Sequence, residues 1–182
     1  MKKSLAVKTA RSGLFLALAL IVSLLEGLIP PLVPVLPYAK LGLGNVVLLA
    51  CFLVTGTGAG YVVLILKCLL SAVFAGNFSM LVWSLPSALA AYTAMTLLYR
   101  TKLFSVAGLS VLGGMIHNAV QILVAVFVVA ETVVVYLPYM LVAGGLAGLV
   151  TGCACHFVLS ALSAYGPSGR DLTYRRLPRG EI

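Results

Sequence analysis

The 182-residue sequence contains few charged residues, and acids are especially scarce. Asp, Glu, Lys and Arg together make up 9% of the chain, with four acids in total, whereas 62% of residues are hydrophobic. Mean hydropathy is +1.16. Soluble globular domains carry roughly 25% charged residues, so this composition predicts an integral membrane protein. At about 20 apolar residues per helical span, the chain has room for roughly six spans and none for a separate soluble catalytic domain.

The shortage of acids also limits the chemistry. Asp171 is the only aspartate, so the paired acidic clusters that hold magnesium for diphosphate chemistry are absent. His117 and His156 lack the sequence context of a Ser-His-acid triad. The segment GTGAG at residues 56–60 is not followed by the Gly-Lys-Ser/Thr of a phosphate-binding loop. We therefore predict no catalytic residues, no metal site and no cofactor, and expect that the chain is not an enzyme.

Cysteines are few as well, and all four lie in apolar stretches, at Cys51, Cys68, Cys153 and Cys155. A C-x-C pair within an apolar helix lacks the C-x-x-C spacing of zinc or redox sites. We interpret them as core residues.

The apolar runs predict an all-α bundle of six transmembrane helices. Pro, Gly or charge separates runs at about residues 12–30, 42–57, 59–76, 79–99, 104–130 and 137–164. Only TGTGAG at residues 55–60, interpreted as a tight turn, divides the second run from the third. The transmembrane domain is thus expected over residues 1–165, followed by a basic tail over 166–182.

The first run follows basic residues, as a secretory signal does. It has no small-x-small cleavage site after it, and Glu26 and the Pro30–Pro31 pair come next. We therefore favour a retained first span over a cleaved signal.

Basic residues mark the cytoplasmic side of membrane proteins. An even number of spans with the N-terminus inside places ten of the twelve Lys and Arg there: Lys2, Lys3, Lys8, Arg11, Arg100, Lys102, Arg170, Arg175, Arg176 and Arg179. Lys40 would then lie outside and Lys67 within the third span. We expect a multi-pass protein of a bacterial plasma membrane with both termini cytoplasmic. The net charge of +8 is an insertion signal and gives no reason to expect a nucleic-acid partner. The tail either rests on anionic membrane lipid or is simply solvated.

Polar residues at membrane depth are costly and tend to be functional. On the fifth span Ser110, Gly114, Asn118, Gln121 and Ala125 share one helical face, because they follow at three- or four-residue steps. The topology puts most buried polar groups in the outer half, below the proline-rich segment EGLIPPLVPVLPYAKLGLGN, which we interpret as a lid. The candidate ligand-binding residues are Glu26, Lys40, Asn45, Lys67, Asn77, Trp83, His117, Asn118 and Gln121.

Two alternatives stay open for these residues. The amides could join helices by hydrogen bonds, and Lys67 could pair with Glu26 instead of serving a ligand.

Small residues form two further patterns, of the kind that lets helices approach closely. Ala6, Ala10, Gly13 and Ala17 lie on one face of the first span, which we interpret as a candidate contact for a partner subunit. Gly144, Gly148 and Gly152 form a ladder on the sixth span, which could pack within the bundle or against a partner.

Four segments together resemble the Gx transporter family, also labelled heptaprenyl diphosphate synthase component I. They are EGLIPPLVPVLPYAKLGLGN, KCLLSAVFAGNFS, GLSVLGGMIHNAVQ and YLPYMLVAGGLAGLVTG. The family resembles the S components of energy-coupling factor (ECF) importers, whose first extracellular loop closes over the ligand. Their first helix carries an Ala-x-x-x-Ala contact for the transmembrane coupling subunit, a spacing that Ala6 and Ala10 match. Family members tend to accompany quinone-synthesis and flavin-linked electron-transfer proteins.

These observations lead to two functional hypotheses. The first is a substrate-capturing subunit of an ECF-type importer for a small anionic or carbonyl-rich metabolite or cofactor precursor, working with a coupling subunit and ATPase subunits. The second is an accessory membrane subunit of a quinone, polyprenyl or flavin-linked electron-transfer system that transports nothing.

Overall fold

The computed structural model describes residues 2–29 and 42–165 as an all-helical bundle. Its elements are α1 (Lys2–Gly27), α2 (Asn45–Thr55), α3 (Thr57–Phe74), α4 (Ser79–Thr101), α5 (Val106–Val128), the 3-10 helix η1 (Glu131–Tyr136) and α6 (Leu137–Tyr165). The expectation of an all-α membrane fold is confirmed. Five of these stretches are long and apolar enough to cross a membrane: Ala6–Gly27, Thr57–Phe74, Ser79–Thr101, Val106–Val128 and Glu131–Phe157.

The second helix is shorter than the apolar run 42–57 led us to expect. Helix α2 has 11 residues, which rise only about 16 Å at 1.5 Å per residue. It lies at the centre of the bundle, because it contacts each of the other five α-helices. Seven of its 11 residues are buried. Thus α2 is a core element about half as long as the hydrocarbon layer is thick.

Gly56 alone joins α2 to α3, with a φ of 100° that suits glycine. The Tyr92 hydroxyl donates to the carbonyl oxygen of Thr57 at 2.8 Å. Tyr61, in turn, lies edge-on to the Tyr92 ring. Backbone groups inside a membrane need protein partners, and these contacts supply one at the α2–α3 turn.

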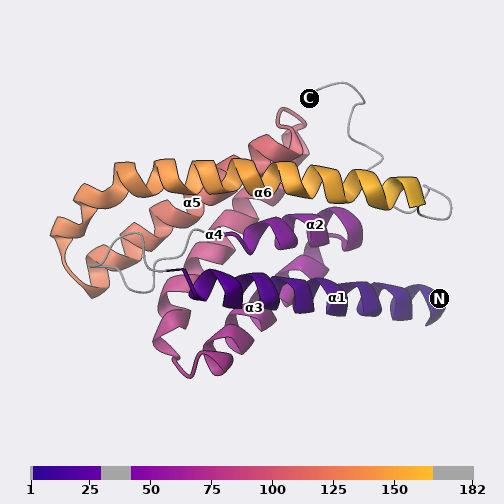
Figure 1. Cartoon of the computed structure of the whole chain (residues 1–182), viewed down its shortest axis with the longest axis horizontal. Coiled ribbons are helices and arrows are strands. Elements are labelled where there is room, and N and C mark those ends of the chain that lie inside the picture. Colours follow the sequence, from indigo (N-terminus) through magenta and orange to yellow (C-terminus); the bar gives the residue numbers. More distant parts are fainter. Residues whose placement is uncertain (1, 30–41, 166–182) are drawn as a thin grey trace.

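Helices α1 and α6 lie along the long axis of the molecule, with α2 between them (Figure 1). The first residues of α1 and the last residues of α6 point to the same end of the bundle (Figure 1). Among the described helices, α1 packs on α2 and α3 alone, whereas α5 lies between α4 and α6. Helix α1 is therefore peripheral, and it begins at Lys2, ten residues earlier than its apolar run.

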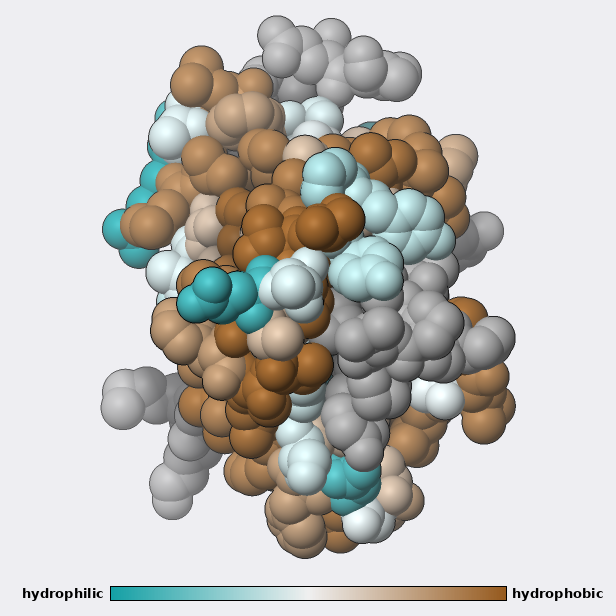
Figure 2. Space-filling model, turned by 90° about the vertical axis from the view of Figure 1, so that its left-hand side faces the viewer, coloured by the Kyte–Doolittle hydropathy of each residue, from teal (hydrophilic) through white to brown (hydrophobic). Residues whose placement is uncertain are grey.

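The outer surface of the bundle is apolar along the helices. Phe74, Phe127 and Val142 are 64%, 82% and 62% exposed, as expected of side chains that face lipid. The end of the bundle opposite the first residues of α1 carries both hydrophobic and hydrophilic residues (Figure 2). The proline-rich segment from Pro30 to Leu41, with Lys40, and the basic tail over 166–182 lie outside the described residues.

Candidate ligand-binding site

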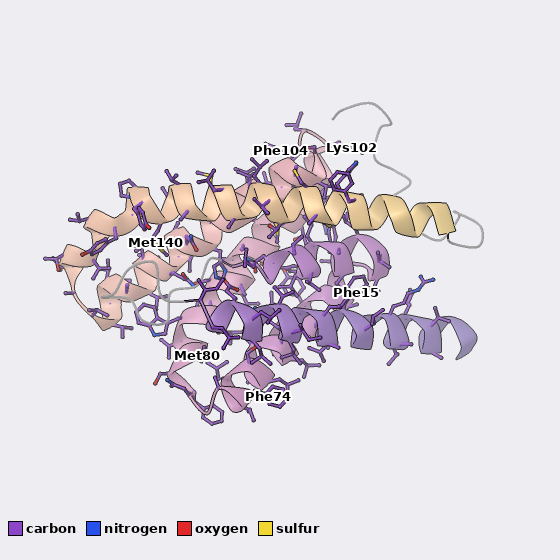
Figure 3. All side chains as sticks on the ribbon, in the orientation of Figure 1. Phe15, Phe74, Met80, Lys102, Phe104 and Met140 are labelled. Atoms are coloured by element: carbon purple, nitrogen blue, oxygen red, sulfur yellow. The ribbon has the colours of Figure 1, made fainter. Side chains whose placement is uncertain are left out.

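Polar side chains from four helices meet around one small cavity of about 20 Å³, enough for roughly one water molecule. Met80, labelled in Figure 3, lies in its wall near the last turns of α1. The described lining consists of Gly42, which precedes α2, and of residues from four helices. These are Ser23 and Glu26 from α1; Lys67, Cys68, Ser71 and Ala72 from α3; Met80 and Ser84 from α4; and His117 and Gln121 from α5.

Glu26 fastens the two ends of the first loop together. Its Oε1 accepts hydrogen bonds from the backbone N–H of Gly42 at 2.6 Å and of Leu43 at 3.4 Å. The side chain is only 5% exposed. Hydrogen bonds to a carboxylate are stronger than those between neutral groups. The carboxylate therefore holds the chain entering α2 against the end of α1.

Two glycines let this backbone lie directly against polar side chains at the cavity. A methyl group on Gly42 would lie 2.9 Å from Asn45 Nδ2 and 3.0 Å from His117 Cδ2, and Gly42 also has a φ of +81°. A methyl group on Gly44 would lie 3.0 Å from Lys67 Nζ. A side chain at either position would displace these polar neighbours. The two glycines of the Gly-Leu-Gly-Asn sequence therefore allow the backbone to pack closely against them.

Lys67 is the one cation among the described lining residues, and it is 7% exposed. Within residues 2–29 and 42–165 it makes no hydrogen bond or ion pair, and the expected alternative of a pair with Glu26 is not formed. Ser71, one turn further along α3, donates instead to Ser23 of α1 at 3.2 Å. The Lys67 side chain, within an apolar helix, is therefore left for another partner at the cavity.

His117 and Gln121 form a pair on α5, with 3.1 Å between the two Nε2 atoms. Since the Gln121 amide nitrogen is a donor, the His117 Nε2 acts as the acceptor. Gln121 is 1% exposed, and its Oε1 has no hydrogen-bond partner among the described residues. Asn45 Nδ2, beside Gly42, is likewise buried and unbonded.

The rest of the α5 polar face packs against α6. Asn118 donates through Nδ2 to the Met140 carbonyl at 2.8 Å, and Ser110 bonds to Thr151 at 3.2 Å. We expected the polar face of α5 to line a single pocket. Instead, His117 and Gln121 line the cavity, whereas Asn118 joins α5 to α6 by a hydrogen bond, which was the alternative interpretation of the amides.

The glycine ladder of α6 packs inside the bundle. Methyl groups on Gly144 and Gly148 would lie 2.5 Å from the carbonyl oxygens of Gly114 and Ser110, respectively. A methyl group on Gly152 would lie 2.8 Å from Ala107 Cα. The two helices thus approach backbone to backbone, which only glycine permits.

Two further candidates lie away from the cavity. Trp83 is 5% exposed and belongs to an apolar cluster with Ile122, Ala125, Val133 and Met140. Asn77 accepts the Ser79 N–H through Oδ1 at 3.0 Å, so it helps to begin α4. Of the nine candidates, Glu26, Lys67, His117 and Gln121 line the cavity and Asn45 adjoins it.

Sequence reasoning missed Ser23 and Ser71. Each shares a helical face with a predicted residue, since Ser23 precedes Glu26 by three positions and Ser71 follows Lys67 by four. That spacing could have identified both.

The small residues of α1 lie on a free face of the helix. Ala6, Ala10, Gly13 and Ala17 are all exposed, and a methyl group on Gly13 would meet nothing within 4 Å. The opposite face of α1 contributes Phe15, Ala19, Ser23 and Glu26 to the interior. The face with the small residues is thus open to another helix.

The described part of the chain contains no group of three or more His, Cys, Asp or Glu side chains that could hold a metal ion. Its four cysteines are free thiols, of which only Cys153 is exposed.

Comparison with known proteins gives one match. The family model described as heptaprenyl diphosphate synthase component I matches residues 15–158. No curated protein and no solved structure matches the chain. The matched region contains all five helices that could cross a membrane, apart from the start of α1. The chain belongs to the heptaprenyl diphosphate synthase component I family, which is of the Gx transporter and ECF S-component type.

Proposed function

We propose that this protein is the substrate-capturing membrane subunit of an ECF-type importer for a small anionic or carbonyl-rich metabolite or cofactor precursor. The observation that carries the proposal is the state of Lys67, which is 7% exposed, lines the cavity and makes no hydrogen bond or ion pair with the described residues. A buried charge without a partner is expensive. A ligand oxygen at Nζ would provide that partner.

The architecture around Lys67 supports capture from one side of the membrane. The cavity lies where Glu26 holds the two ends of the first loop together. At about 20 Å³ it is too small for a metabolite, so its walls must separate before a ligand enters. Gly42 is the described lining residue that lies outside the helices, and we assign the first loop, which leads into it, the role of the lid. With both termini in the cytoplasm of a bacterial cell, this lid is extracellular.

The energy for release comes from partners in this proposal. The sequence has no Gly-Lys-Ser/Thr phosphate loop, so ATP hydrolysis is assigned to separate ATPase subunits. A transmembrane coupling subunit would contact the exposed small-residue face of α1, from Ala6 to Ala17. The chain itself carries out no catalysis.

A second candidate function follows from two other observations. The family is named for a component of a synthase, and the cavity at the polar cluster has a volume of only about 20 Å³. Both fit an accessory membrane subunit of a quinone, polyprenyl or electron-transfer system with no transport of its own.

Native mass spectrometry of the gently extracted protein separates the two candidates. Retention of a water-soluble metabolite, together with co-purification of a coupling subunit and ATPases on co-expression, is the result expected for an importer subunit. Retention of lipid alone, with no such subunits, would favour the accessory role and contradict the importer.

A further inference from the structure

We infer that the group captured at this cavity is an uncharged amide, lactam or imide edge, which presents C=O and N–H side by side. This inference rests on the proposed function, because it specifies what the same site binds. It narrows the substrate from anionic or carbonyl-rich to carbonyl with an adjacent N–H.

Hydrogen-bonding capacity is left over at the site. Asn45 Nδ2, which adjoins the cavity beside Gly42, is a buried donor with no partner among the described residues. Lys67 Nζ, a donor from the lining itself, makes no hydrogen bond or ion pair with the described residues. Gln121 Oε1 is a buried acceptor that likewise has no partner among the described residues, and the Gln121 residue is only 1% exposed. Buried polar groups normally have hydrogen bonds. A carboxylate would satisfy the donors and leave Gln121 Oε1 without a proton to accept, whereas an amide edge satisfies both kinds of group.

Gln121 presents its oxygen because its amide nitrogen is already bonded. Its Nε2 is 3.1 Å from His117 Nε2, so the amide nitrogen is already used as a donor within α5. The carbonyl oxygen of the same amide is then the free end. His117 thereby orients Gln121 and determines that the site offers an acceptor there.

The charge of the site favours the same group. Among the described lining residues, Glu26 and Lys67 are the Glu and Lys side chains, of opposite formal charge, and they do not form an ion pair. A monoanion would leave this part of the cavity with a net negative charge, and uncompensated charge is costly away from water. A neutral dipolar group keeps the net charge of Glu26, Lys67 and the ligand at zero.

Cys68 provides a built-in reporter, because this thiol lines the cavity. Iodoacetamide and iodoacetate have nearly the same shape and differ in carrying an amide or a carboxylate. Each alkylates a thiolate by forming the S–C bond as the C–I bond breaks and iodide leaves. Both rates would be measured on the full chain with Cys51, Cys153 and Cys155 changed to Ala. The rates on the same protein unfolded in detergent give the intrinsic reactivity of each reagent.

We expect the folded protein to favour iodoacetamide over iodoacetate by at least fivefold beyond the intrinsic ratio. Gln121→Leu should abolish that preference, and Met80→Leu, at an apolar position of the same lining, should preserve it. Retained helical content and elution as a single species show whether Gln121→Leu is folded. If it is not, excess unlabelled acetamide, acetate and N,N-dimethylacetamide test the same point in the parent protein. Acetamide should then protect Cys68 best.

Equal normalised rates would mean that the polar atoms bind only water, and faster iodoacetate would mean an anion site. Failure to label Cys68 with either reagent would mean that the cavity does not admit such a group. Each result overturns the inference. None of them decides the importer role, which depends on metabolite retention and subunit co-purification. An anion preference with retained metabolite would leave capture intact with a different substrate class.

Discussion

The carboxylate of Glu26 accepts the backbone N–H of Gly42 at 2.6 Å, across a separation of 16 residues. It joins the end of α1 to the chain that enters α2. The proline-rich segment is the chain between these two points, so one buried side chain fixes both ends of that segment to the bundle.

Removing this contact should loosen the entry to α2. Hydrogen bonds to charged groups contribute about 1.5–3 kcal/mol, so Glu26→Ala should raise hydrogen exchange at the Gly42 and Leu43 amides by roughly tenfold or more. Exchange mass spectrometry of the peptide that covers residues 42–45 measures this. Glu131→Ala, which removes an exposed acid from η1, is the control. Equal exchange in the two variants would show that Glu26 does not hold this segment.

Lys67→Met should abolish metabolite retention and leave the bundle folded. The side chain has no described protein partner, so its loss removes a desolvation cost without breaking a bond. The midpoint of thermal unfolding should stay the same or rise, and ligand retention should fall at least tenfold by native mass spectrometry. Lys102→Met, at an exposed position, should change neither. An unfolded Lys67→Met protein that Glu26→Gln rescues would identify a structural pair instead.

The glycines of α6 and α1 should respond oppositely to alanine. In Gly148→Ala the new methyl would lie 2.5 Å from the Ser110 carbonyl oxygen, and overpacking of this kind costs about 1–3 kcal/mol. In Gly13→Ala the methyl meets nothing within 4 Å, and helix propensity improves by up to about 1 kcal/mol. Unfolding midpoints should therefore fall for Gly148→Ala and hold or rise for Gly13→Ala. A loss of stability from Gly13→Ala alone would reverse this assignment of the two faces.

Ala10→Trp should leave ligand retention intact and abolish co-purification with a transmembrane coupling subunit. The position is exposed and distant in sequence from every cavity-lining residue, so added bulk blocks helix approach without reaching the site. Val142→Trp, on the exposed side of α6, controls for bulk at a lipid-facing position. If both variants still bring down the coupling subunit, the contact lies elsewhere.

Single cysteines at Tyr38 and Gly169, in a background without the native four, should react from opposite sides of the membrane. This follows from the ten basic residues assigned to the cytoplasm. The measurement is labelling of intact cells by an impermeant maleimide, which should modify Tyr38→Cys and spare Gly169→Cys until the cells are opened. Modification of both in intact cells would rule out this topology.

The sequence predicted the helix order well, because Pro, Gly and charge interrupt the apolar runs where the helices end. It did not predict the length of α2, since apolar flanks such as Leu43 extend the run without being helical. The apolar run that begins at about residue 12 and helix α1, which begins at Lys2, start at different points, because hydropathy marks the apolar part of a helix and not the turns that carry Lys8 and Arg11.

The candidate site could be predicted only in part. Helical spacing puts His117, Asn118 and Gln121 near one another on α5, but a face about 100° wide meets two neighbours. Asn118 reaches the Met140 carbonyl of α6, and Gln121 reaches the cavity beside α3 and α4. Which neighbour lies on which side is a tertiary fact. Trp83 was also among the candidates, and its ring packs among apolar residues.

The shortness of α2 has a mechanical consequence. The polar cavity lies near the start of this helix. The rings of Tyr61, Tyr92 and Tyr99 gather near its end, where the ring centroids of Phe52 and Tyr99 are 5.0 Å apart. Aromatic side chains of α4 therefore pack against the end of α2, beside aliphatic residues of the same buried cluster. Side chains turn about χ1 and χ2 without breaking backbone hydrogen bonds. Rotation of these rings would change the packing at this end of α2 with every helix still intact.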